Sequence, residues 1–226
     1  MSRPEHTSQP RISASHLLIL PFPKSLTHSF YRPRNGRNIT RAQLFAALHN
    51  PDTYNVSKPL AIVLAYGGFI MMHRLTAHSL SLHDLSQHNL IEHDASVVHK
   101  DTTPGHKFAP IRCDTVLLNK LLENDHDVLT LKQVSKRREE LERTDPLDLL
   151  HQEIARGEWA LVLDIFGREN GGDCPHEVLR VWLKQNRFPE GWKPSHEQGL
   201  LDTMSVVSHI RDEMKKLQKA VQPSAS

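Results

Sequence analysis

The chain has 226 residues, of which 38% are hydrophobic, and this suits one globular domain. Its 28 Lys and Arg nearly balance 26 Asp and Glu, which leaves a formal net charge of +2. This charge, without a basic run, argues against nucleic-acid binding. The longest apolar run, Leu60 to Met72, is too short to cross a bilayer, so we expect no membrane insertion.

The two ends of the chain differ in composition from the middle. They are rich in Ser, Pro and Gln without periodicity, which predicts disordered tails at 1–16 and 219–226 around a domain at 17–218. The apolar stretch Leu17–Leu20 is closed by Pro21 and does not fit a secretory signal. We therefore expect an intracellular, cytoplasmic protein.

Helix signals follow one another along the domain, and no run alternates over more than a few residues. Capping boxes begin at Thr40 and Ser195, and Pro59 suits the first turn of another helix. The expected helices cover 40–50, 60–75, 81–92, 115–123, 131–143, 147–156, 158–166, 177–185 and a last stretch that ends near Ala220. This pattern predicts a single all-α domain of about eight to ten helices.

Two of these helices carry further expectations. The 60–75 helix is apolar nearly all round, so we expect it to be the central buried helix. The 131–143 helix is densely charged, so we expect it to face solvent.

The segment Glu92-His93-Asp94-Ala95-Ser96 groups ionisable side chains and a hydroxyl at the end of an apolar run. If it is helical, Glu92 and Ser96 share a face and supply oxygen ligands for a hard divalent cation. His93 would point away from them and serve a cavity as an acid or base. A solvated, capped helix end is the alternative.

Four motifs lie at comparable places in one known family. They are Pro-Arg-Asn-Gly-Arg-Asn-Ile-Thr at 33–40, Leu-His-Asp-Leu-Ser-Gln-His-Asn-Leu-Ile-Glu-His-Asp-Ala-Ser at 82–96, Gly-Glu at 157–158 with Gly167, and Arg-Phe-Pro-Glu-Gly-Trp-Lys-Pro at 187–194. Together they resemble the fungal heme-thiolate haloperoxidases, the chloroperoxidase and unspecific peroxygenase family. The resemblance implies a chloroperoxidase-like helical fold.

The resemblance also implies roles for particular residues. Glu158 matches the family's distal acid–base glutamate, and His93 matches a histidine close to it. Glu92, the His93 backbone and Ser96 match a metal site beside a heme carboxylate, which would hold Mg²⁺ or Mn²⁺.

The chain departs from the family at the iron ligand. The family's Pro-Cys-Pro reads Pro21-Phe22-Pro23 here, and a phenyl ring cannot bind iron. We therefore expect no cofactor, with heme on another ligand such as His28 as the alternative. An emptied heme pocket would bind a hydrophobic small molecule. Its expected lining is Phe22, Phe30, Leu90, Trp159 and Val162.

These residues predict a heme-free, redox-neutral enzyme of fungal secondary metabolism. Glu158 and His93 would act as an acid–base pair in a cyclisation or cycloaddition, such as a hetero-Diels–Alder step after dehydration to a quinone methide. One alternative is a heme peroxidase or peroxygenase with a non-cysteine ligand, and another is a non-catalytic small-molecule-binding protein. Whether the protein is a homo-oligomer stays open.

Overall fold

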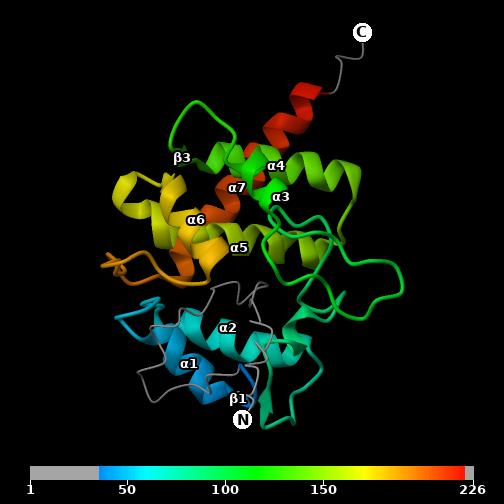
Figure 1. Cartoon of the computed structure of the whole chain (residues 1–226), viewed down its shortest axis with the longest axis vertical. Helices are drawn as coiled ribbons and strands as arrows, with labels where there is room; N and C mark the ends of the chain where they lie inside the picture. The colour runs from blue at the N-terminus through cyan, green and yellow to red at the C-terminus, as the bar shows by residue number, and fades with distance from the viewer. Residues whose placement is uncertain (1–35, 222–226) are drawn as a thin grey trace, which may run out of the picture.

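The computed structural model describes residues 36–221, and helices dominate this part of the chain. Figure 1 shows α1 and α2 together at one end and α3 to α7 at the other. The α-helices are α1 (Arg41–His49), α2 (Lys58–Met71), α3 (Thr115–Leu121), α4 (Leu131–Thr144), α5 (Leu149–Gly167), α6 (His176–Gln185) and α7 (Leu200–Val221). The all-α class is confirmed.

Short elements join the helices. They are the 3-10 helices η2 (Asp84–Ser86) and η3 (Arg168–Asn170), and the strands β1 (Ile39–Thr40), β2 (Ser79–Leu80), β3 (Val128–Leu129) and β4 (Cys174–Pro175). Two antiparallel pairs form, β1 with β2 and β3 with β4. Each pair brings together segments that are distant in sequence and so fixes the ends of the neighbouring helices.

Local capping chemistry sets several helix starts. Thr40 and Gln43 form the expected capping box, with reciprocal backbone bonds of 3.2 and 3.0 Å. Asp114 caps α3 by accepting from the first-turn amides of Val116 and Leu117. The predicted box at Ser195 is wrong, because α7 begins only at Leu200.

The helix that carries Glu158 is one continuous element. Residues 147–156 and 158–166 were expected as two helices, but α5 runs unbroken from Leu149 to Gly167. Gly157 lies inside it, and a glycine in a helix interior costs only about 1 kcal/mol, which tertiary packing outweighs. Helix α5 packs against α7, and α7 in turn packs against α4. Glu158 is thus fixed on a rigid, well-supported helix.

Two expectations about burial are wrong. Helix α2 is not buried all round, because Ile62, Val63, Tyr66 and Ile70 remain exposed on one face while the other face packs on α1. Helix α4 is not simply solvated, because its Arg138 is only 1% exposed. In neither helix does the sequence alone indicate which face is buried. Helix α2 is apolar on both faces, and α4 buries charged groups in pairs.

An aromatic cluster connects the two groups of helices. Phe166, Trp182 and Trp192 pack together with Phe188, whose ring lies 5.3 Å from that of Tyr54 in the α1–α2 connection. Aromatic contacts of this kind bury large apolar areas. They hold the segment after α6 against the α1–α2 end of the molecule.

The predicted boundaries of the domain can be compared with the structure only in part. Helix α7 continues to Val221, into the tail predicted from residue 219. The predicted tail at 1–16 lies outside the described residues. Within residues 36–221, no helix is both long enough and apolar enough to cross a membrane.

Candidate active site

The 92–96 motif lies in a long irregular segment between η2 and α3. The expected helix into Glu92 is wrong, because only Asp84–Ser86 is helical there. Asn89 and Ala95 take left-handed backbone angles, with φ of 60° and 57°, which a continuous right-handed helix excludes. Glu92 and Ser96 are therefore not neighbours on one helical face.

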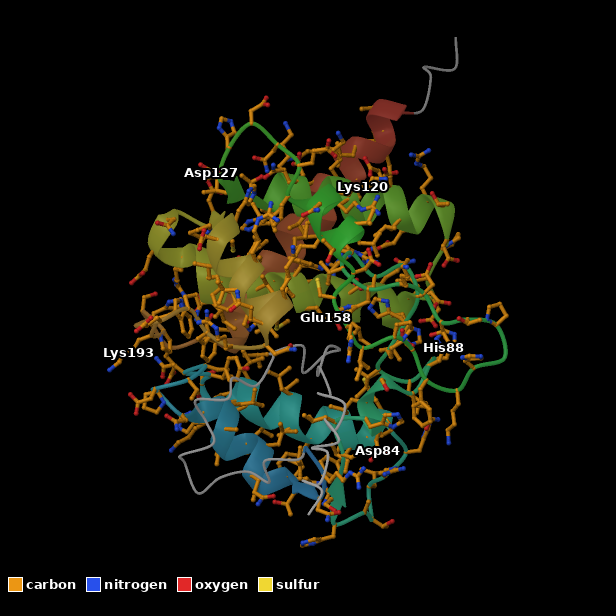
Figure 2. All side chains as sticks on the ribbon, viewed as in Figure 1. Asp84, His88, Lys120, Asp127, Glu158 and Lys193 are labelled. Atoms are coloured by element: carbon orange, nitrogen blue, oxygen red, sulfur yellow. The ribbon has the colours of Figure 1, made fainter. Side chains whose placement is uncertain are left out.

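The two predicted catalytic residues meet in the interior. His93 Nε2 lies 3.8 Å from Glu158 Oε2, and the two side chains are 3% and 7% exposed. Glu158 comes from the middle of α5 and lies near the centre of the molecule in Figure 2. The structure thus joins two residues that are far apart in the sequence.

The proton positions on His93 follow from its contacts. Nδ1 lies 2.6 Å from the Asp94 carbonyl oxygen, which can only accept, so Nδ1 carries a hydrogen. Nε2 is buried and has no hydrogen-bond partner among the described residues. Burial lowers the pKa of His93, but Glu158 and the Asp94 carbonyl outweigh it and raise this pKa above its ordinary value. Proton exchange at this ring is therefore confined to Nε2.

Arg138 is a site residue that the sequence analysis missed. From α4 it donates to the Ala95 carbonyl at 2.6 Å and to Glu142 at 2.8 Å. Its positive charge is also felt by His93, whose pKa it lowers. Arg138 therefore ties the segment that carries His93 to the helical body. Only knowledge of which face of α4 is buried reveals this role.

His151 was also missed. Its Nδ1 lies 2.6 Å from Asp148 and its Nε2 3.3 Å from the Leu90 carbonyl, while its ring lies 6.0 Å from the His93 ring. His151 thereby fixes the backbone at Leu90 beside the pair. The sequence does contain a local indication of this contact, because Asp148 lies three residues before His151 and caps α5.

Comparison with known proteins identifies a family for this chain. Residues 27–197 match the family described as "Peroxidase, family 2", which is chloroperoxidase-like. The chain belongs to this family. A search of the curated proteins finds no match. The matched range includes both His93 and Glu158, and the family is one of peroxidase-type enzymes.

The family implies heme, and the described residues do not fit its thiolate ligand. Burial raises the pKa of the Cys113 thiol to about 11. Burial also raises the pKa of Cys174, whose sulfur lies 3.5 Å from the Val162 carbonyl in the core. Cys174 Sγ also lies 3.9 Å from the Leu163 carbonyl, and Cys113 Sγ lies 3.8 Å from the Asp114 carbonyl. Both sulfurs are thus engaged with backbone oxygens, whereas the heme iron of this family needs a free cysteine thiolate. Phe22, at the family's cysteine position, lies outside the described residues.

The metal ligands that the resemblance implies are engaged with different partners. Glu92 Oε2 lies 2.9 Å from His88 Nδ1, and Ser96 Oγ lies 3.3 Å from His99 Nδ1. Burial raises the pKa of Glu92, and the contact with His88 opposes this effect. His88 was not among the predicted ligands. Glu92 and His93 are neighbours in the sequence, but Glu92 contacts His88 whereas His93 faces Glu158.

The predicted pocket residues are distributed unevenly. Trp159 and Val162 are buried in the core and Leu90 is half-buried, while Phe22 and Phe30 lie outside the described residues. A cavity of about 660 Å³ lies elsewhere, between the β1–β2 pair and the segment before α3. Arginines and serines line it, and Leu90, Trp159 and Val162, the predicted pocket residues within 36–221, do not. The substrate pocket thus stays a prediction.

Proposed function

We propose that this member of the family is a heme-free enzyme that moves a proton on a hydrophobic small molecule. The observation that carries the proposal is the buried His93 Nε2, which lacks a hydrogen-bond partner among the described residues and faces Glu158 Oε2 at 3.8 Å. A buried polar atom without a partner costs free energy, so its persistence is typical of functional sites. A substrate hydroxyl group is a suitable partner for this nitrogen.

The pair can act as a proton donor and a proton acceptor together. With Nδ1 held by the Asp94 carbonyl, only Nε2 donates, and the Glu158 carboxylate accepts. Both side chains are almost inaccessible to water, so their electrostatic effect on a bound substrate is strong. Arg138 keeps the backbone at Ala95 in place while the proton moves.

The reaction that we propose needs no oxidant. Nε2–H protonates a benzylic hydroxyl, the C–O bond breaks and water leaves. Glu158 accepts the phenolic proton, which yields a neutral ortho-quinone methide. This diene joins an alkene in a hetero-Diels–Alder step, in which two σ bonds form from two π bonds. Transfer of the proton from Glu158 back to His93 resets the pair, and orientation of the two reactants supplies further acceleration.

The experiment uses ortho-hydroxybenzyl alcohol and an enol ether as probes, without peroxide or oxygen, and measures formation of the 2-alkoxychroman. We expect Glu158→Gln to lower turnover by about a hundredfold or more, because glutamine cannot accept a proton. Glu177→Gln, at an exposed acid on α6, is the matched control and should retain full turnover. Equal turnover in a folded Glu158→Gln protein would refute the acid–base role of Glu158, and wild-type turnover no faster than the uncatalysed reaction would favour the non-catalytic binding protein.

The family match favours a second candidate, a heme peroxidase or peroxygenase with a non-cysteine iron ligand. The absorption spectrum and iron content of the purified full chain discriminate between the two. A Soret band with stoichiometric iron, and turnover that requires peroxide, would refute the heme-free proposal. Protein without iron that still forms the chroman would exclude the peroxidase.

A further inference from the structure

A second group of polar side chains lies outside the His93–Glu158 pair. His88, Glu92 and Asp94 bring ligand-type atoms within 4.8 Å of one another. They belong to the irregular segment between η2 and α3, and His88 lies on this loop in Figure 2. Glu92 is 1% exposed, whereas His88 and Asp94 are half-buried, so the group is anchored inside and reachable from solvent.

We propose that His88 Nδ1, Glu92 Oε2 and Thr102 Oγ1 bind a divalent transition-metal ion of the zinc type, such as Zn²⁺ or Co²⁺. The three atoms form a compact triangle. Nδ1 lies 2.9 Å from Oε2 and 3.0 Å from Oγ1, and Oγ1 lies 3.5 Å from Oε2. This set differs from Glu92, His93 and Ser96 and needs no heme carboxylate.

The triangle has the dimensions of one face of a coordination polyhedron. Ligands about 2.1 Å from a metal ion are separated by about 3.0 Å in an octahedron and about 3.4 Å in a tetrahedron. The three observed separations lie close to these values. An ion on this face would bind the three side chains with little rearrangement, and water would complete its coordination.

Asp94 occupies the place of a supporting carboxylate. Its Oδ2 lies 3.6 Å from His88 Nε2, and its Oδ1 accepts from the Thr102 backbone amide at 2.8 Å. A metal-bound histidine commonly donates its other ring N–H to a carboxylate, which fixes the tautomer and the ring. Asp94 thus helps to position His88 and Thr102, two of the three proposed ligands, without binding the ion itself.

The ligand types decide the class of metal. An imidazole nitrogen suits zinc and other transition metals, whereas Mg²⁺ and Ca²⁺ prefer oxygen ligands alone. The alternative is that no ion binds and that His88, Glu92 and Thr102 hold the loop through their contacts with one another. A bound metal ion would close the chain between residues 88 and 102. It would also fix the backbone beside His93 whether or not that residue is catalytic.

The test is a titration of the full chain, purified without a histidine tag and treated with EDTA, with Co²⁺ alone. Calorimetry and visible absorption bands of bound Co²⁺ are the readouts. We expect one equivalent to bind and Zn²⁺, but not Mg²⁺, to displace it. His88→Gln should abolish this equivalent, and Asp94→Asn should weaken it by about 10–100-fold. His106→Gln, at an exposed histidine of the same loop, is the matched control and should bind normally.

A milder pair of variants covers the case in which His88→Gln does not fold. Thr102→Val removes the hydroxyl at nearly constant shape and should weaken Co²⁺ binding, whereas Thr102→Ser keeps the hydroxyl and should preserve it. Absence of a stoichiometric Co²⁺ equivalent would overturn the proposal and favour a loop held by the side-chain contacts alone. Binding that is unchanged in folded His88→Gln, or equal in the two Thr102 variants, would also overturn it.

Discussion

His99 should make the protein sensitive to mild acid. The side chain is 2% exposed, and burial lowers its pKa from 6.5 to about 4. Below pH 6.5 the unfolded chain binds a proton that the folded protein does not, so the free energy of unfolding falls as the pH falls towards 4. At about 1.4 kcal/mol per pH unit, the loss between pH 7 and pH 5 is about 2 kcal/mol.

The assay is urea unfolding at pH 7, 6 and 5 in EDTA, with the wild type compared with His99→Gln. Glutamine does not titrate in this range and can still bond to Ser96 Oγ, which lies 3.3 Å from His99 Nδ1. The other groups titrate in both proteins, so the difference between the two pH slopes isolates His99. Parallel slopes would refute the reasoning, because they would mean that His99 binds protons equally in both states.

Three further variants test packing in α4 and α5. Gly167→Ala should destabilise by about 1–3 kcal/mol, because a Cβ there would lie 2.7 Å from the Gly172 carbonyl oxygen. Gly157→Ala meets nothing within 4 Å and should stabilise by about 0.5–1 kcal/mol, and thermal unfolding that ranks the two variants otherwise would contradict this. Arg138→Met should cost about 3 kcal/mol in chemical unfolding, since it removes one buried partner of Glu142 and the donor to Ala95. A neutral effect would mean that the bond between α4 and Ala95 contributes little.

The sequence predicts features that depend on a few neighbouring residues. The capping box at Thr40 was identified correctly because it is completed within one helical turn. The all-α class follows from hydrophobic periodicity and is confirmed. The helix predicted at 81–92 is wrong because the pattern of apolar residues gives no sign of the left-handed backbone at Asn89.

Contacts between distant segments require other information. His93 and Glu158 are 65 positions apart, and no spacing rule connects them. Only the family resemblance placed them together. Arg138 was not identified, because a charged helix is normally read as solvated, and the bond to the Ala95 carbonyl is invisible in the sequence. The contact between His88 and Thr102 was not predicted for a similar reason, since these two residues meet only through the fold of the loop.

The position of His93 depends on polar bonds rather than on regular secondary structure. On its C-terminal side, the Ala95 amide donates to Asp101 at 2.7 Å and the Ala95 carbonyl accepts from Arg138 at 2.6 Å. Asp94 Oδ1 accepts from the Thr102 amide at 2.8 Å. Each of these hydrogen bonds joins two separated residues and closes a loop of the chain. The free energy of each bond must offset the conformational entropy that the loop loses when it is ordered. A loop held at successive residues can orient a ring as firmly as a helix does. His93 is therefore presented to α5 by a segment whose rigidity comes from its own aspartates and from Arg138.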